Sequence, residues 1–222
     1  MTLSRVSGGL HGSSGSGPVV YAEPDKEGDP TGDVDEHGEV RGGGRVHMER
    51  AGGDIQLEEA PAGAVVSTGG GDIVVGRAGG SVEASTGGGS IRLGPVAGDV
   101  RAGTGAGDVE VTVVDAGGEP QSVVVKSGHG RVVIDLPAGF DGRVELETAY
   151  TRNVEPTRIE APWQLERSTS DWSDREGFGE GTPRRYVRAK GTVGGGHGLL
   201  RVKTVNGDVI VRMGGARSSM PW

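Results

Sequence analysis

Cysteine is missing from the 222 residues of this chain, which excludes disulfide bonds, thiolate nucleophiles and cysteine-ligated metal sites. Aromatic residues are scarce at 4%, so a core must be built from Val, Ile, Leu and Ala, which suit a thin interior. Basic residues are fewer than acidic ones, 23 against 31, and no Lys/Arg-rich segment could follow a phosphate backbone. We therefore expect no nucleic-acid partner.

Long apolar runs are also absent. No stretch of ~18 apolar residues is present to cross a membrane, and residues 1–18 lack the apolar segment of a secretory signal. We expect a soluble chain without direct membrane insertion. It would be cytoplasmic by default, and in the cell envelope if an upstream export signal is missing.

Glycine is abundant instead, with 45 residues, but it does not recur at every third position as in collagen. It recurs every nine residues, each time followed by one residue and then by a β-branched one. The spacing breaks only between Gly53 and Gly71, where Gly63 is displaced by one position. The glycines that carry the repeat are Gly44, Gly53, Gly71, Gly80, Gly89, Gly98 and Gly107. A period this short predicts one strand and one turn in each unit.

Apolar residues alternate within each unit, as expected of a strand with one buried face. Units with two large inward residues, such as Ile73 and Val75, alternate with units that have one large and one small, such as Val82 and Ala84. The sequence therefore predicts an all-β fold, a single-stranded parallel β-helix (β-solenoid) with 18-residue rungs of two nine-residue strand-turn units. Parallel crossovers favour a right-handed path.

Residues 18 apart should then lie side by side on neighbouring strands. The large series runs through Ile55, Ile73, Ile91 and Val109. Two outward pairs provide an independent check of this register, because Glu83 and Arg101, and also Arg92 and Glu110, carry opposite charges 18 residues apart. Such neighbours are expected to attract each other.

The repeat divides the chain into three parts. Residues 1–43 are expected to be mostly disordered or loosely capping, with residues 19–21 as a capping strand. Residues 44–213 are expected to form the solenoid domain, with later strands near Val123, Val132, Val144, Leu200 and Val209. An aromatic-bearing insertion at 148–190 breaks the pattern, and residues 214–222 form a C-terminal tail.

Three sequence features resemble a bacterial β-strand-repeat family of unknown function that is often labelled adhesin. They are the Gly-Asp-Ile and Gly-Asp-Val strands, the phrase DLPAGF at residues 135–140 and the phrase VKTVNGDVIV at residues 202–211. The resemblance covers roughly residues 42–213 apart from the insertion, and it implies a single-stranded right-handed β-helix. Many members are exported or tethered to membranes. A likeness of fold implies no catalytic residues, and this chain departs from the family in its insertion and in lacking an evident export signal.

Aspartate follows several of the turn glycines, which raises the possibility of calcium binding, because calcium-dependent β-rolls also have 18-residue rungs. In that repeat, however, the aspartate stands two residues before the buried apolar residue, and here it stands directly before it. One aspartate per turn also supplies few of the ~6 to 8 oxygen ligands that calcium takes. We therefore expect these side chains to accept hydrogen bonds from turn N–H groups, as in Asx turns. They are Asp54, Asp72, Asp99, Asp108 and Asp208.

Other candidate chemistry is weak. The glycine-rich segment 103–107 is not followed by a helix pattern, so it is expected to be a turn and not a phosphate loop. The histidines lack the paired spacing of a zinc site and are expected to be solvated; they are His11, His37, His47, His129 and His197. A polysaccharide-cleaving groove would need carboxylates or an arginine, for which the candidates near the insertion are Asp135, Glu145, Glu147 and Arg152.

The preferred functional interpretation is a non-catalytic scaffold or adhesion-like binding module, with no cofactor and no metal. Its partner would be an unknown protein or carbohydrate, and the candidate contact residues are Trp163, Trp172, Phe178 and Tyr186 in the insertion. The alternative is a polysaccharide-active or calcium-dependent β-roll-type solenoid. Outward apolar residues at Val124, Val133 and Ile210 predict a cover, either the insertion with its tryptophans or a second copy of the chain in a homo-oligomer.

Overall fold

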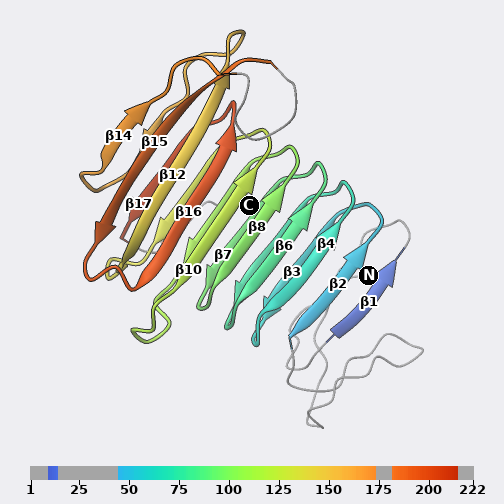
Figure 1. Cartoon of the computed structure of the whole chain (residues 1–222). Helices are drawn as coiled ribbons and strands as arrows, with labels where there is room; N and C mark the ends of the chain where they lie inside the picture. Colours follow the sequence, from blue (N-terminus) through green and yellow to red (C-terminus); the bar gives the residue numbers. More distant parts are fainter. Residues whose placement is uncertain (1–9, 15–44, 174–181, 215–222) are drawn as a thin grey trace.

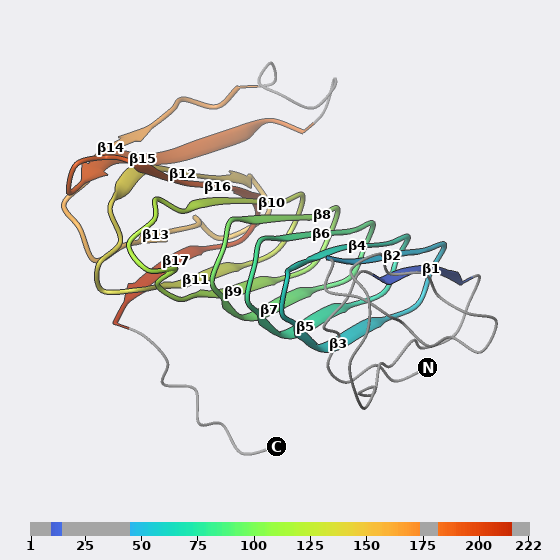
Figure 2. The same cartoon turned by 90° about the horizontal axis from the view of Figure 1, so that it is seen from below.

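A computed structural model of the chain describes residues 10–14, 45–173 and 182–214, and all regular elements in these ranges are β-strands. The strands form two sheets that face each other across one core (Figures 1 and 2). None of the described residues belongs to a helix of the length and hydrophobicity that a membrane span requires.

Sheet A has seven strands, in the spatial order β3 (Ile55–Ala60), β5 (Ile73–Ala78), β7 (Ile91–Val96), β9 (Val109–Val113), β11 (Val132–Leu136), β17 (Val209–Met213) and β13 (Ile159–Glu160). Sheet B has ten, in the order β1 (Leu10–Ser14), β2 (Val46–Arg50), β4 (Ala64–Thr68), β6 (Val82–Thr86), β8 (Val100–Thr104), β10 (Ser122–Ser127), β16 (Gly198–Val205), β12 (Gly142–Thr151), β15 (Arg184–Val193) and β14 (Glu166–Thr169). All pairings are parallel except those of β15 with β12 and β14.

From β2 to β11 the chain passes alternately through sheet B and sheet A, so that one strand of each forms a rung of the stack. Ile73 lies beside Ile91, and Val82 beside Val100, which confirms the predicted 18-residue register. The charge check also holds. Glu83 lies beside Arg101, and Arg92 Nε is 3.1 Å from Glu110 Oε2.

The core consists of the inward aliphatic residues of both sheets. Sheet A contributes large pairs such as Ile91 and Leu93, each 1% exposed, and sheet B contributes mixed pairs such as Val100 and Ala102, each 2% exposed. The two kinds of repeat unit thus belong to different sheets. The inward alanines Ala64, Ala84 and Ala102 of β4, β6 and β8 keep the interior narrow in this part of the stack.

A column of hydroxyl groups runs along one side of this core. From β4 onward, a buried Thr or Ser of each sheet B strand up to β12 donates to a glycine carbonyl in a turn of the neighbouring rung, as Thr86 Oγ1 does to Gly71 O at 2.8 Å. The other members of the column are Thr68, Thr104, Ser127, Thr148 and Thr204. These bonds satisfy carbonyls that the strand ladders leave unpaired.

One rung is longer than the others. Val100 pairs with Val123 and Val109 with Val132, a separation of 23 residues, because an additional turn lies between β9 and β10. Asp115 holds this turn, since its Oδ1 accepts the N–H groups of Gly117 and Gly118 at 2.9 and 2.8 Å.

The last two strands of the chain lie inside the stack and not at its end. β16 is inserted between β10 and β12, where Leu200 pairs with both Val123 and Val144, and β17 lies between β11 and β13. The segment expected as an irregular insertion therefore ends the stack. Its first residues extend β12, and its last residues form most of β15.

At the opposite end, the strand that pairs with β2 is β1, with Leu10 beside Val46. The capping strand was expected at residues 19–21, which lie outside the described residues. Both ends of the stack share one property: sheet B extends beyond the last strand of sheet A, with β1 at one end and β15 and β14 at the other (Figure 2).

Candidate functional site

The turn aspartates bond to the backbone, as predicted, but across rungs. Asp54 Oδ1 accepts the N–H of Asp72 at 2.9 Å, and Asp72 Oδ1 accepts that of Ser90 at 2.7 Å. Asp99, Asp108 and Asp208 bond in the same way to Ser122, Arg131 and Arg158. Each carboxylate thus fixes the equivalent turn of the next rung, whereas an Asx turn would bond within its own. Across residues 45–173 and 182–214, no three His, Asp or Glu side chains are grouped to hold a metal ion.

The candidate carboxylates of a polysaccharide-cleaving site do not meet. Glu145 and Glu147 lie on the outward face of β12, where Glu145 accepts from Arg201 at 2.8 Å and Glu147 from Arg188 at 2.7 Å. The hydrogen bond from Arg201 lowers the pKa of Glu145. Asp135 lies on sheet A, where burial raises its pKa, and the guanidinium of Arg152 lies 5.2 Å from the Trp172 ring centroid.

His197 has a partner that sequence reasoning missed. Its Nδ1 is 2.9 Å from Asp141 Oδ2, and Asp141 Oδ1 accepts the N–H of Gly196 at 2.6 Å. The hydrogen bond with the His197 side chain, together with the backbone N–H groups of residues 195–197, lowers the pKa of Asp141 to about 2. The pair borders a cavity of about 320 Å³ whose lining residues include no Ser, Thr or Tyr. It therefore resembles part of a hydrolytic triad without a nucleophile.

The other histidines lie apart from this pair. His11 is in β1, His47 is on the exposed face of β2, and His129 is in the turn between β10 and β11. His37 lies outside the described residues.

The aromatic candidates do not form one surface. Trp163 is partly buried and packs on Phe140 with ring centroids 5.8 Å apart, whereas Trp172 is 38% exposed and makes a T-shaped contact with Tyr150. Tyr186 is buried beneath Arg188, and Phe178 lies outside the described residues. Both tryptophans are thus at the C-terminal end of the stack. Val124, one of the outward valines, lies between Arg101 and Arg201 of the neighbouring strands.

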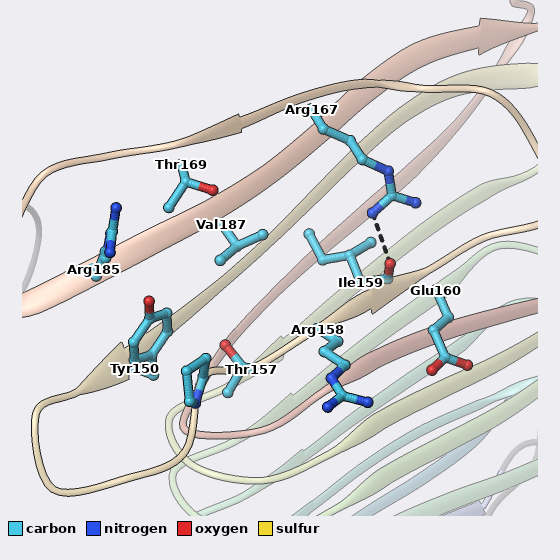
Figure 3. Close-up of a pocket in the computed structure, with 10 residues that line it drawn as sticks. Tyr150, Thr157, Arg158, Ile159, Glu160, Arg167, Thr169, Arg185 and Val187 are labelled. Carbon is cyan, nitrogen blue, oxygen red and sulfur yellow. Dashed lines mark hydrogen bonds between the residues drawn. The ribbon is translucent and has the colours of Figure 1, made fainter.

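An open groove of about 570 Å³ lies at this same end, under the part of sheet B that extends beyond β13 (Figure 3). We call it the cap groove. One wall is formed by the segment 156–160, and the other by the inward faces of β15 and β14. Its lining residues are Tyr150, Pro156, Thr157, Arg158, Ile159, Glu160, Arg167, Thr169, Arg185 and Val187. A further strand of sheet A would occupy this space.

The free edge of β13 faces the groove. Arg158 uses its N–H and its carbonyl toward β17, bonding Asp208 Oδ1 at 2.8 Å and the N–H of Val209 at 2.9 Å. Because successive residues of a strand alternate in direction, the backbone N–H and carbonyl of Ile159 face the groove. Arg167 Nη1 donates to that carbonyl at 2.8 Å. The carbonyl of Ile159 is therefore occupied, whereas its N–H has no hydrogen-bond partner among the described residues.

Arg185 stands at the other end of the groove (Figure 3). Its Nε donates to Ser170 O at 3.0 Å, and its two terminal nitrogens have no hydrogen-bond partner among the described residues. Three arginines and one glutamate line the groove, although the whole chain carries a formal charge of -8. The groove is therefore a local cationic surface on an acidic protein.

The sequence analysis predicted a contact region in the insertion and selected its aromatic residues. It did not select Arg158, Arg167 and Arg185, because only the fold shows that they line one groove. Comparisons with protein-family models, curated proteins and solved structures find no match to this chain. The resemblance to the β-strand-repeat family therefore stays a prediction that rests on the sequence motifs.

Proposed function

We propose that this chain is a single-stranded, right-handed parallel β-helix that acts as a non-catalytic binding module. The alternation of the strands between two sheets and the 18-residue register support the β-helix. In this proposal the regular rungs are a rigid support, and the irregular C-terminal end is the contact region.

The cap groove is the observation that carries the proposal. It is an open surface whose polar groups, the Ile159 N–H and the terminal nitrogens of Arg185, lack partners among the described residues. In the interior rungs of the described stack, the ladders and the turn aspartates use the backbone groups. Unpaired polar groups that gather in a concave site are a common mark of ligand binding.

A binding role also agrees better than catalysis with the carboxylates of β12. Glu145 and Glu147 are held in ion pairs with arginine and lysine side chains, so neither is free to act as an acid or base. Their positions support a structural role in joining the strands of sheet B.

Filling the groove tests the proposal without changing its charge. Thr169→Trp places a large side chain on the groove face of β14, whereas Ser168→Trp places it on the opposite face. Both proteins would be assayed on a panel of neutral polysaccharides, acidic polysaccharides and peptides. We expect at least one probe to bind the wild type and Ser168→Trp but not Thr169→Trp. Equal binding by the two variants, or no binding by the wild type, would refute the proposal.

A further inference from the structure

The polar groups that are free in the cap groove are mainly donors, which restricts what can bind there. The Ile159 N–H and the terminal nitrogens of Arg185 can only donate, and Arg167 keeps donors beyond the one that bonds Ile159 O. A complementary ligand must therefore bring acceptor oxygens. This inference rests on the proposed binding function and concerns the chemical class of the ligand.

The two arginines lie far apart along the groove. In the register of β14 and β15, Arg167 is opposite Ala189, and Ala189 is four residues along β15 from Arg185. At ~3.4 Å per residue this separates their backbone positions by roughly 14 Å. Thr169 and Val187 lie between them (Figure 3). The guanidinium groups are also held at different places, because Arg167 Nη1 bonds Ile159 O and Arg185 Nε bonds Ser170 O. An extended ligand with several negative groups therefore suits them better than one small anion.

The edge of β13 disfavours an added peptide strand. A new strand must both accept from and donate to the edge it joins, but the carbonyl of Ile159 already accepts from Arg167. An extended polymer that presents oxygens and needs no ladder avoids this conflict. The hydroxyls of Tyr150 and Thr169, which also line the groove, can bond to such oxygens or to sugar hydroxyls.

We propose that the cap groove binds an acidic polysaccharide, a chain of uronic acid residues. One carboxylate pairs with the terminal nitrogens of Arg185. A second carboxylate, further along the chain, binds at Arg167 and the neighbouring Ile159 N–H. Arginine suits this task because its planar group donates two parallel hydrogen bonds to a carboxylate.

Calorimetric titration of the full chain at low salt tests the inference. The probes are polygalacturonate and alginate oligomers, methyl-esterified polygalacturonate, and poly-L-glutamate of similar length. Arg185→Gln and Arg167→Gln remove groove charges, and Arg184→Gln is the matched control because Arg184 is the neighbour of Arg185 in β15 but does not line the groove. Thermal melting verifies that each variant is folded.

We expect at least one uronate oligomer to bind, and Arg185→Gln to weaken it roughly ten- to a hundred-fold, the loss of one charge-assisted contact. Arg184→Gln should change affinity by less than about twofold, a change within the usual range of surface substitutions. Binding of the methyl ester that matches the free acid would overturn this inference yet leave the binding function standing. Three other results would also overturn it: a loss of affinity in Arg184→Gln equal to that in Arg185→Gln, stronger binding of poly-L-glutamate than of the uronate oligomers, or no binding of polygalacturonate and alginate.

Discussion

Turn glycines of neighbouring rungs stack so closely that some of them leave no room for a side chain. A Cβ added at Gly89 would lie 2.0 Å from Gly71 O and 2.4 Å from Gly71 C, and Gly71 O is held by the hydroxyl of Thr86. A Cβ added at the adjacent Gly88 would have no heavy atom within 4 Å. Two neighbouring glycines of one turn therefore play different roles.

We expect Gly89→Ala to lower the free energy of unfolding by about 1–3 kcal/mol, as overpacking does, whereas Gly88→Ala should stay within about 0.5 kcal/mol of wild type. Urea unfolding of the two single variants measures the difference. Equal destabilisation would mean that the stacked backbones can separate.

At each of the two free edges of sheet A, one carbonyl group is capped by an arginine. Within the stack, the carbonyl of Asp72 accepts the N–H of Ile55 from the preceding rung, but no rung precedes Asp54. Arg50 Nη1 donates to the Asp54 carbonyl instead, and Arg167 has the same role at Ile159. Arg50 occupies the hydroxyl column beside Thr68, is 4% exposed, and leaves Nε and Nη2 unpaired among the described residues.

Asp141 gives the protein a pH-dependent contact. Its pKa in the folded state is about 2, whereas an unperturbed aspartate has a pKa of about 3.9. The stabilising contribution is therefore complete above about pH 4 and is lost as the pH falls toward 2.

We expect Asp141→Asn to be less stable than wild type between pH 5 and 7, and the gap to shrink as the pH falls from about 4 to 2. Chemical unfolding at a series of pH values measures it. A gap that does not vary with pH would show that the charge of Asp141 contributes nothing.

At the scale of elements, ion pairs connect the strands that the chain brings together out of order. Glu147 of β12 bonds Arg188 of β15 and Lys203 of β16, and Glu145 bonds Arg201 of β16. Burial alone would raise the pKa of Glu147, but Arg188 and Lys203 outweigh it and hold the pKa below its ordinary value. These pairs join β12 to both neighbours.

Replacing Glu147 by Gln should cost about 1 kcal/mol, near the upper end for exposed pairs, because its side chain is only 21% exposed. The same change at Glu110, whose partner Arg92 is 69% exposed, should cost less than about 0.5 kcal/mol. Urea unfolding compares the two variants. A larger loss at Glu110 would contradict the assigned role of the β12 network.

The sequence predicted the strands of the repeat because burial alternates along each one and because the turn glycines mark their limits. It did not predict which strands would be neighbours after β11, since a nine-residue spacing such as that between Leu200 and Val209 fixes a strand without fixing its place in the sheet. The opposite charges of Glu145 and Arg201 carried that information, but only at a separation of 56 residues. The cap groove could not be predicted either, because the order of these strands decides where sheet B extends beyond sheet A.

At the scale of the molecule, the unequal lengths of the sheets protect the ends of the stack. Parallel addition of a second copy would need both edges to meet, but β1 at one end, and β15 and β14 at the other, project beyond sheet A. The outermost strand, β14, is short and carries Glu166 and Arg167, both exposed. Short, charged edge strands discourage pairing between molecules.

Because β16 pairs with both β10 and β12, a destabilising substitution in β16 should affect the strands on both sides. Val202→Asp would place a charge where Val202 is 0% exposed, between β10 and β12, and we expect hydrogen exchange to accelerate from β10 to β17, including strands that precede β16 in the chain. Strands β3 to β7 should keep their protection.

The matched control is Met48→Asp, since Met48 is 3% exposed in β2 at the opposite end of the stack. It should loosen only the first rungs. Loss of protection confined to residues 198–213 in Val202→Asp would show that the last strands are peripheral and that β12 is held by other contacts.

The position of β16 between β10 and β12 imposes an order on folding during synthesis. Residues 142–193 leave the ribosome before residues 198–213, yet the later segment must lie between the earlier one and the rungs already formed. The early rungs can assemble during translation, whereas the space between β10 and β12 must stay open until residues 198–213 have been made. A chain interrupted before residue 198 would therefore expose the unpaired edges of β10 and β12, between which β16 lies in the complete fold.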